Sequence, residues 1–138
     1  MACHQTRRVL VFRSLFIRVV FLITVALLCL LGAPGDNPVA GHWAGRSPNP
    51  IGQTEQVELR ITAVDSGISG VLHTPDVDIP IEKPQLQGRR FTFEATRAFR
   101  GRKIVYHYDG QISADSIDFT VQNDDGSIFF RFLARRAQ

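Results

Sequence analysis

Three histidines are the residues in the foldable part of the chain best suited to metal or acid–base chemistry. His42, His73 and His107 fall on three different predicted strands, and none has another histidine or a cysteine two to four residues away. Zinc sites usually include ligand pairs at such short spacings. A zinc centre would need all three strands to converge, so we expect no metal and no cofactor. Solvated or edge histidines are the simpler interpretation.

Carboxylates occur in two short pairs. Asp76 and Asp78 share one face of a predicted strand, and Asp124 and Asp125 lie in a predicted turn. Such pairs can bind calcium or act as acid and base, but a polar outer face and a turn produce the same pattern. Ser69 lacks the Gly-x-Ser-x-Gly spacing of a nucleophile elbow, and no phosphate-binding glycine loop or HExxH motif occurs. We therefore predict no catalytic residues and no enzymatic activity.

One basic cluster supplies candidate binding residues. The cluster comprises Arg89, Arg90, Arg97, Arg100, Arg102 and Lys103, which flank the predicted Phe91 strand and its following hairpin. The candidate binding residues within it are Arg97, Arg100, Arg102 and Lys103. Guanidinium and ammonium groups recognise anionic polysaccharides, lipid headgroups or acidic partners. A solvated hairpin, balanced by acidic residues elsewhere, explains the same cluster without a ligand.

Charge balance argues against one class of partner. The formal net charge is +3, but Arg7, Arg8, Arg13 and Arg18 all precede the long apolar run. From Gly41 onward the chain contains 12 basic and 12 acidic residues. A neutral domain has no net field to steer it toward polyphosphate, so nucleic acid is not an expected partner.

Three apolar residues fall on predicted outer faces, where their neighbours are polar. They are Val105, Phe129 and Leu133. An exposed apolar patch often marks a partner surface, and Phe129 and Leu133 are therefore further candidate binding residues. The alternative is a bulge that shifts the predicted register by one residue.

Period-two patterning indicates the elements that position these side chains. From Thr54 onward, apolar and polar residues alternate in short runs separated by turn residues such as Asp65-Ser66-Gly67. With the short strand around Trp43, eight strands are predicted and no helix lies between them. Val77–Ile81 is one of these strands, and Pro80 marks it as an edge or a bulge. The fold class is all-β, an antiparallel up-and-down meander forming a barrel or a barrel-like sandwich. Its predicted inner rows contain Phe91, Phe93, Tyr106, Tyr108, Phe119, Phe130 and Phe132.

An export signal is predicted to precede this domain. Residues 1–18 are basic, and residues 19–31 form an uninterrupted apolar run that is short for a membrane span and typical of a signal peptide. The predicted division is a signal peptide or signal anchor with linker at 1–40 and a β domain at 41–138. The domain is expected to be periplasmic or secreted, with the chain's N-terminus cytoplasmic. The sequence leaves open whether the leader is cleaved or retained as an anchor, and whether export uses the Sec or the twin-arginine route.

The two ends of the β region resemble a known superfamily. Gly41 and Trp43 form a Gly-x-Trp start, and the last predicted strand ends in Phe132-Leu133-Ala134-Arg135-Arg136. This pattern resembles calycin or lipocalin-like β-barrels and, more closely, small exported bacterial domains of unknown function. The resemblance implies that Trp43 closes one barrel end and that Arg135, or a neighbouring arginine, covers it. Gly41, Trp43 and Arg135 are then structural residues.

The sequence predicts a binding role more readily than a reaction. Our first expectation is a non-enzymatic module that binds an envelope protein, a glycan or a small apolar ligand. Alternatives are an inhibitor of a hydrolase or another envelope-protein partner, and a hydrolase that uses Asp and His groups at the barrel mouth. Membrane contact is expected only through residues 19–31, and only if the leader is retained.

Overall fold

The computed structural model describes residues 37–64 and 67–138. The predicted signal helix lies outside the described residues. Within them, no helix has the length and apolar character needed to cross a membrane.

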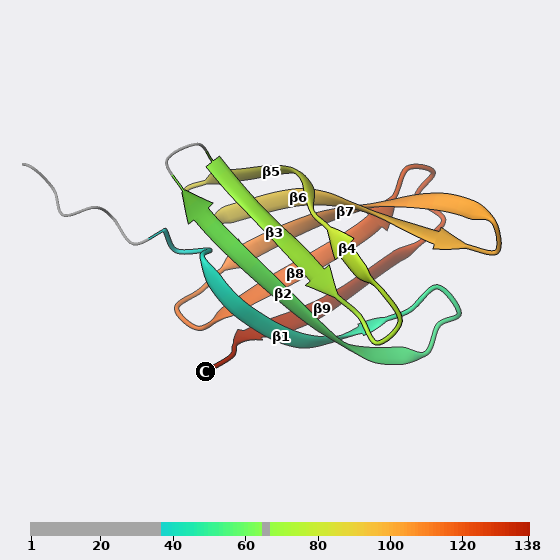
Figure 1. Cartoon of the computed structure of the whole chain (residues 1–138), viewed down its shortest axis with the longest axis horizontal. Helices are drawn as coiled ribbons and strands as arrows, with labels where there is room; N and C mark the ends of the chain where they lie inside the picture. The colour runs from blue at the N-terminus through green and yellow to red at the C-terminus, as the bar shows by residue number, and fades with distance from the viewer. Residues whose placement is uncertain (1–36, 65–66) are drawn as a thin grey trace, which may run out of the picture. The chain divides into compact units, whose positions relative to one another are not determined.

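The described chain is all-β and forms an antiparallel meander, which confirms the coarser part of the predicted fold class, but the sheet does not close into a barrel. Nine strands form one antiparallel sheet in the order β4-β3-β2-β1-β9-β8-β7-β6-β5 (Figure 1). The strands are β1 Gly41–Pro48, β2 Thr54–Val64, β3 Gly67–His73, β4 Asp78–Pro80, β5 Glu82–Gln87, β6 Arg90–Phe99, β7 Arg102–Ile112, β8 Ser116–Asn123 and β9 Phe129–Arg136. Every pair of neighbours in the sheet is also consecutive in sequence except β1 and β9, which join the two halves of the meander.

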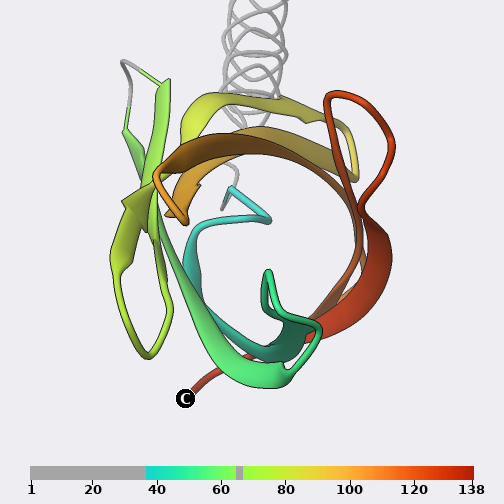
Figure 2. The ribbon, with the colours of Figure 1, turned by 90° about the vertical axis from the view of Figure 1, so that its right-hand side faces the viewer.

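The prediction of eight strands was wrong by one. The region predicted as one strand, Val77–Ile81, contains β4, and the chain then forms β5, which pairs with β6 instead of β3. A bulge between Glu82 and Gln85 includes Lys83, whose φ of 48° breaks regular strand geometry. β4 and β5 are the two edges of the sheet, so the sheet curls strongly without closing (Figure 2).

The inside of the curl is filled with aromatic rings. Phe93 stacks on Tyr108 with ring centroids 4.4 Å apart, and Phe119 stacks on Phe132 at 5.2 Å. Gly110 makes room for this packing, because a Cβ there would lie 2.6 Å from the Phe119 ring. Of the seven predicted inner residues, six are buried and Phe130 is half-buried. Period two therefore identified the inner face correctly.

Trp43 lies at one end of the curled sheet, here called the tryptophan end. Its side chain is fully buried, and its indole N–H donates to the Val39 carbonyl at 2.8 Å. The arginine that covers it is Arg136, with its guanidinium carbon 4.1 Å from the ring centroid. The sequence predicted Arg135 or a neighbouring arginine in this place, and the neighbour is the correct choice, because Arg135 lies on the outward row of β9 and is exposed. Alternation explains the difference, since Ala134 and Arg136 fall on the row opposite Arg135.

Arg136 also fixes the segment that leads into β1. Its guanidinium donates to the carbonyls of Ala40, at 2.9 Å, and Pro38, at 3.1 Å. Gly41 adopts a φ of 125°, and a Cβ there would lie 2.7 Å from the Arg136 guanidinium. Glycine is therefore required at this position for both the backbone conformation and the close approach.

Candidate functional site

The opposite end of the sheet, here called the loop end, contains a largely buried ion pair. Arg97, near the end of β6, donates to Glu55, near the start of β2, with 2.6 Å between Nη1 and Oε1. The side chains are only 13% and 9% exposed, respectively. Arg97 continues the inward row of Phe93 and Ala95 by period two, so the sheet turns it inside. It does not belong to a surface basic cluster with Arg100, Arg102 and Lys103, as the sequence had suggested.

A buried hydroxyl lies beside this ion pair. Tyr106 Oη is buried without a hydrogen-bond partner, and burial raises the pKa of this phenol. A cavity of about 20 Å³ is lined by Tyr106, Glu55, Arg97 and Ser47, among other residues. A space of this size holds about one water molecule. The aromatic interior therefore offers no room at this cavity for a small apolar ligand.

A much larger hollow, here called the loop-end groove, lies just outside. Its volume is about 490 Å³. Arg97 borders both this groove and the inner cavity, with its Nη2 3.6 Å from the Asp76 carboxylate. Ile51 and Val77 on the groove walls are 56% and 44% exposed. The lining residues are Asn49, Pro50, Ile51, Asp76, Val77, Asp78, Ile79, Pro80, Thr96, Arg97, Ala98 and Phe99.

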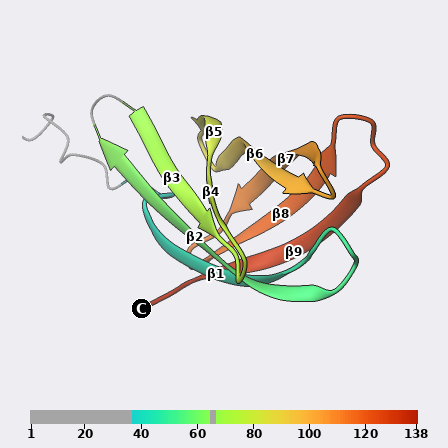
Figure 3. The same ribbon diagram turned by 45° about the vertical axis from the view of Figure 1, so that its right-hand side comes forward.

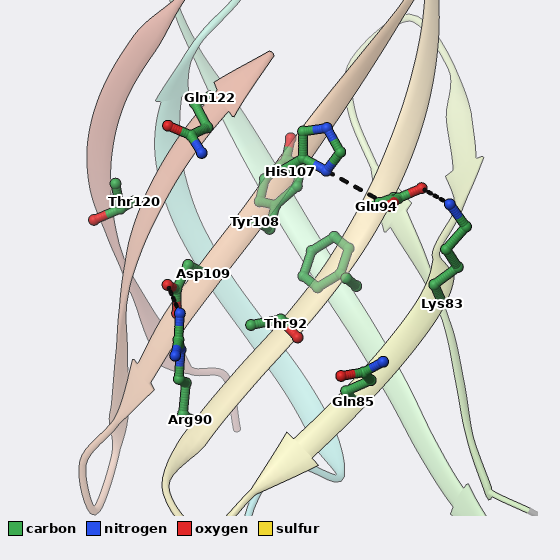
Figure 4. Close-up of a pocket in the computed structure, with 11 residues that line it drawn as sticks. Lys83, Gln85, Arg90, Thr92, Glu94, His107, Tyr108, Asp109, Thr120 and Gln122 are labelled. Carbon is green, nitrogen blue, oxygen red and sulfur yellow. Dashed lines mark hydrogen bonds and ion pairs between the residues drawn. The ribbon is translucent and has the colours of Figure 1, made fainter. Parts of the chain in front are cut away.

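A second hollow, here called the outer groove, runs over the outward faces of β5 to β8 (Figure 4). Its volume is also about 490 Å³, and its walls include amides, hydroxyls and charged groups beside the rings of Phe93 and Tyr108. Lys83 pairs with Glu94 at 2.8 Å, and this carboxylate raises the pKa of Lys83. Arg90 pairs with Asp109 through two hydrogen bonds of 2.9 and 2.6 Å. The charges on this face are thus largely matched to one another.

The other predicted binding residues are separated in space. Arg100 lies over the Phe99 ring at 5.2 Å, in the turn between β6 and β7. Arg102 and Lys103 border a different hollow, together with the turn between β8 and β9. The four basic residues predicted as one cluster therefore face three different surroundings.

The predicted apolar outer patch does not form. Phe129 and Leu133 do point outward and are exposed, so the register predicted for β9 is correct. Arg131 stands between them on the same face and pairs with Asp118 at 2.8 Å. Val105 lies on β7, with β8 between it and β9. These residues are isolated apolar side chains on a polar face.

Each histidine of the described chain pairs with a different carboxylate. His42 lies 3.2 Å from Glu58, His73 lies 2.6 Å from Asp78, and a third pair, His107 with Asp124, is 2.5 Å apart. The three pairs are on different strands. In the part of the chain that the structure describes, no group of three or more His, Cys, Asp or Glu side chains could hold a metal ion.

The members of each aspartate pair predicted from the sequence contact different partners. Asp76 faces Arg97 while Asp78 contacts His73. Asp124 contacts His107, whereas Asp125 accepts a hydrogen bond from the Ser127 backbone, and hydrogen bonds from Ser127 lower its pKa.

Comparison with protein-family models, with curated proteins and with solved structures finds no match. The loop-end groove was not predicted from the sequence. One signal did point to it: Pro80 marked β4 as an edge or a bulge, and the groove lies along that edge.

Proposed function

We propose that this domain is a non-enzymatic binding module of the cell envelope or extracellular space, and that it binds its partner in the loop-end groove. The observation that carries the proposal is the contrast between a nearly filled interior, with a cavity of about 20 Å³, and an external groove of about 490 Å³ with exposed apolar walls. Specific ligand sites are concave and largely apolar, with a few fixed polar groups.

The contrast with the outer groove also favours this site. In the outer groove, Lys83 and Arg90 are already paired with carboxylates. A charged partner would have to displace those contacts, and exposed ion pairs contribute little to affinity. In the loop-end groove, a partner would bury the exposed side chains of Ile51 and Val77. Burial of apolar surface is the dominant favourable contribution to the free energy of association.

The test is fragment mapping by two-dimensional NMR on the ¹⁵N-labelled protein. Small apolar and amide-bearing fragments should shift resonances of Ile51, Val77 and Ala98. Resonances of Thr92 and Thr120 in the outer groove serve as the internal control and should stay unchanged. Shifts confined to the outer groove, or turnover of ester, peptide or glycoside substrates by the purified protein, would overturn the proposal.

The proposal includes an exported location and a lipocalin-like arrangement of the curled sheet. The stacking of Arg136 on Trp43 and the pairing of β1 with β9 support the resemblance stated above. An alkaline phosphatase domain fused to the C-terminus of the full chain tests the location, since that enzyme folds only after export. An inactive fusion would place the domain in the cytoplasm.

A further inference from the structure

The loop-end groove exposes an unpaired stretch of strand β6. The ladder between β5 and β6 ends at the pair Glu82–Glu94, whereas the ladder between β6 and β7 continues to Phe99 and Arg102. Residues 95–98 of β6 therefore have a strand neighbour on one side only. Such an edge presents backbone groups that can pair with another extended chain.

The register identifies which backbone groups are free. Phe99 and Arg102 flank a two-residue turn, so they form the hydrogen-bonded pair that closes the hairpin. Because hydrogen-bonded pairs alternate along an antiparallel ladder, Thr96 and Ala98 direct their N–H and C=O groups away from β7. Among the described residues, no backbone partner meets these groups on the other side.

Pro80 explains why β4 does not pair with this edge. The Ile81 N–H donates to the Gly70 carbonyl, and the Thr74 N–H donates to the Val77 carbonyl. Because hydrogen-bonded pairs alternate along an antiparallel ladder, the backbone hydrogen-bonding groups of Asp78 and Pro80 point away from β3, toward β6. Pro80 has no N–H to donate. The tip of the β6–β7 hairpin and the loop between β3 and β4 separate toward the loop end (Figures 1 and 3). The loop-end groove is lined by residues of both segments, among them Val77 and Phe99.

The side chains of the groove define the chemistry of an occupant. Ile51 and Val77 offer apolar contact, and the carboxylates of Asp76 and Asp78 are largely exposed. The charge of Arg97, the cation deepest in this groove, is already matched by Glu55. Asp78 is paired with His73 at 2.6 Å, whereas the Asp76 carboxylate lies 3.6 Å from Arg97 Nη2. The surface left for a partner is thus apolar, beside a strand edge, with Asp76 as its weakly paired carboxylate.

We propose that the loop-end groove binds an extended segment of a partner protein in which apolar residues alternate with lysine or arginine. The segment adds to the edge of β6 at Thr96 and Ala98, places an apolar side chain between Ile51 and Val77, and pairs a basic side chain with Asp76. This inference rests on the function proposed above and names the class of partner.

Fluorescence anisotropy with the full-length protein and three acetylated, labelled hexapeptides tests it. The first alternates lysine with valine, the second alternates glutamate with valine, and the third is the first with N-methyl groups on its valines. We expect saturable binding of the first peptide, and binding at least about tenfold weaker for the other two, because they lose the charge contacts or the backbone hydrogen bonds.

Two protein variants complete the test. Asp76→Asn should weaken binding of the lysine peptide by about three- to tenfold, while Asp115→Asn, an exposed aspartate at the tryptophan end, should leave it unchanged. Equal binding of the lysine and glutamate peptides, no binding up to about 1 mM, or equal effects of the two variants would overturn this inference. Fragments that still map to Ile51 and Val77 would then leave the proposed function standing. Self-association in sedimentation experiments would make a second copy the occupant and likewise overturn it.

Discussion

The two ends of the sheet are closed by different chemistry. At the tryptophan end, Trp43 is fully buried, its N–H has a partner, and Arg136 covers the ring. At the loop end, Arg97 and Glu55 are buried as an ion pair beside the unpartnered hydroxyl of Tyr106. Burying charges costs desolvation free energy that apolar residues of similar size would avoid. The first end is therefore organised for stability, and the second retains costly polar groups next to the groove proposed to bind.

Truncating Trp43 should have the largest effect. Trp43→Ala removes a fully buried aromatic side chain and should lower the free energy of unfolding by about 3–5 kcal/mol. Urea denaturation followed by far-ultraviolet circular dichroism measures it. Trp43→Phe is the control, because it keeps most of the volume and should lose less. A Trp43→Ala protein of wild-type stability that fails to bind the lysine peptide would reverse the roles of the two ends.

Breaking the ion pair should be the next largest effect. Arg97→Met leaves the Glu55 carboxylate buried without a partner, and we expect a loss of about 3 kcal/mol in the same denaturation experiment. The double variant Arg97→Met, Glu55→Gln should recover much of that loss, because no unpaired charge stays buried. If the double variant lost as much stability as the sum of the losses of Arg97→Met and Glu55→Gln measured separately, the pair would not be energetically coupled.

Much of the fold follows from period two. The rule that places Phe91 and Phe93 inside also places Arg97 inside, and it places Glu55 on the row of Val57 and Leu59. The inward ion pair was therefore present in the pattern, but clustering by charge placed Arg97 on the surface. The same alternation would have selected Arg136 over Arg135.

The groove could not be predicted in this way. It depends on how close the loop around Ile51, the loop around Val77 and the end of β6 lie in space. These segments are distant in sequence, and alternation within a strand carries no information about them. The irregularity in the β5–β6 ladder includes Lys83, where φ is positive for a residue type that rarely adopts it, and alternation does not predict it either.

Alkaline pH should destabilise the interior near the loop end. The chain's two tyrosines, Tyr106 and Tyr108, both have phenol pKa values raised by burial. An unfolded tyrosine ionises near pH 10, so above that pH the folded state retains protons that the unfolded state loses. These phenols leave the free energy of unfolding unchanged below about pH 10. Above that pH, Tyr108 lowers it by up to about 1.4 kcal/mol per pH unit, and Tyr106 lowers it in the same direction by less.

The absorbance of tyrosinate provides the measurement. It should rise together with the loss of the circular dichroism signal as the pH increases. Tyr108→Phe should reduce the slope of stability against pH. Tyr106→Phe should do the same and also cost little stability at neutral pH, because the hydroxyl it removes has no partner. Ionisation of both phenols near pH 10 in a protein that stays folded would contradict the predicted burial.

The smallest predicted effect distinguishes two adjacent arginines. Arg136→Ala removes the contact with the Trp43 ring and two hydrogen bonds to backbone carbonyls, and should lower the free energy of unfolding by about 1–2 kcal/mol. Arg135→Ala, on the outward face, should change it by less than about 0.5 kcal/mol. The loss of stability for Arg136→Lys should lie between those of the two alanine variants, because an ammonium group keeps the charge but lacks the planar guanidinium that reaches both carbonyls. Equal losses for the two alanine variants in urea denaturation would mean that Arg136 does not stabilise the tryptophan end, and that Trp43 and the segment before β1 close it without help from the last strand.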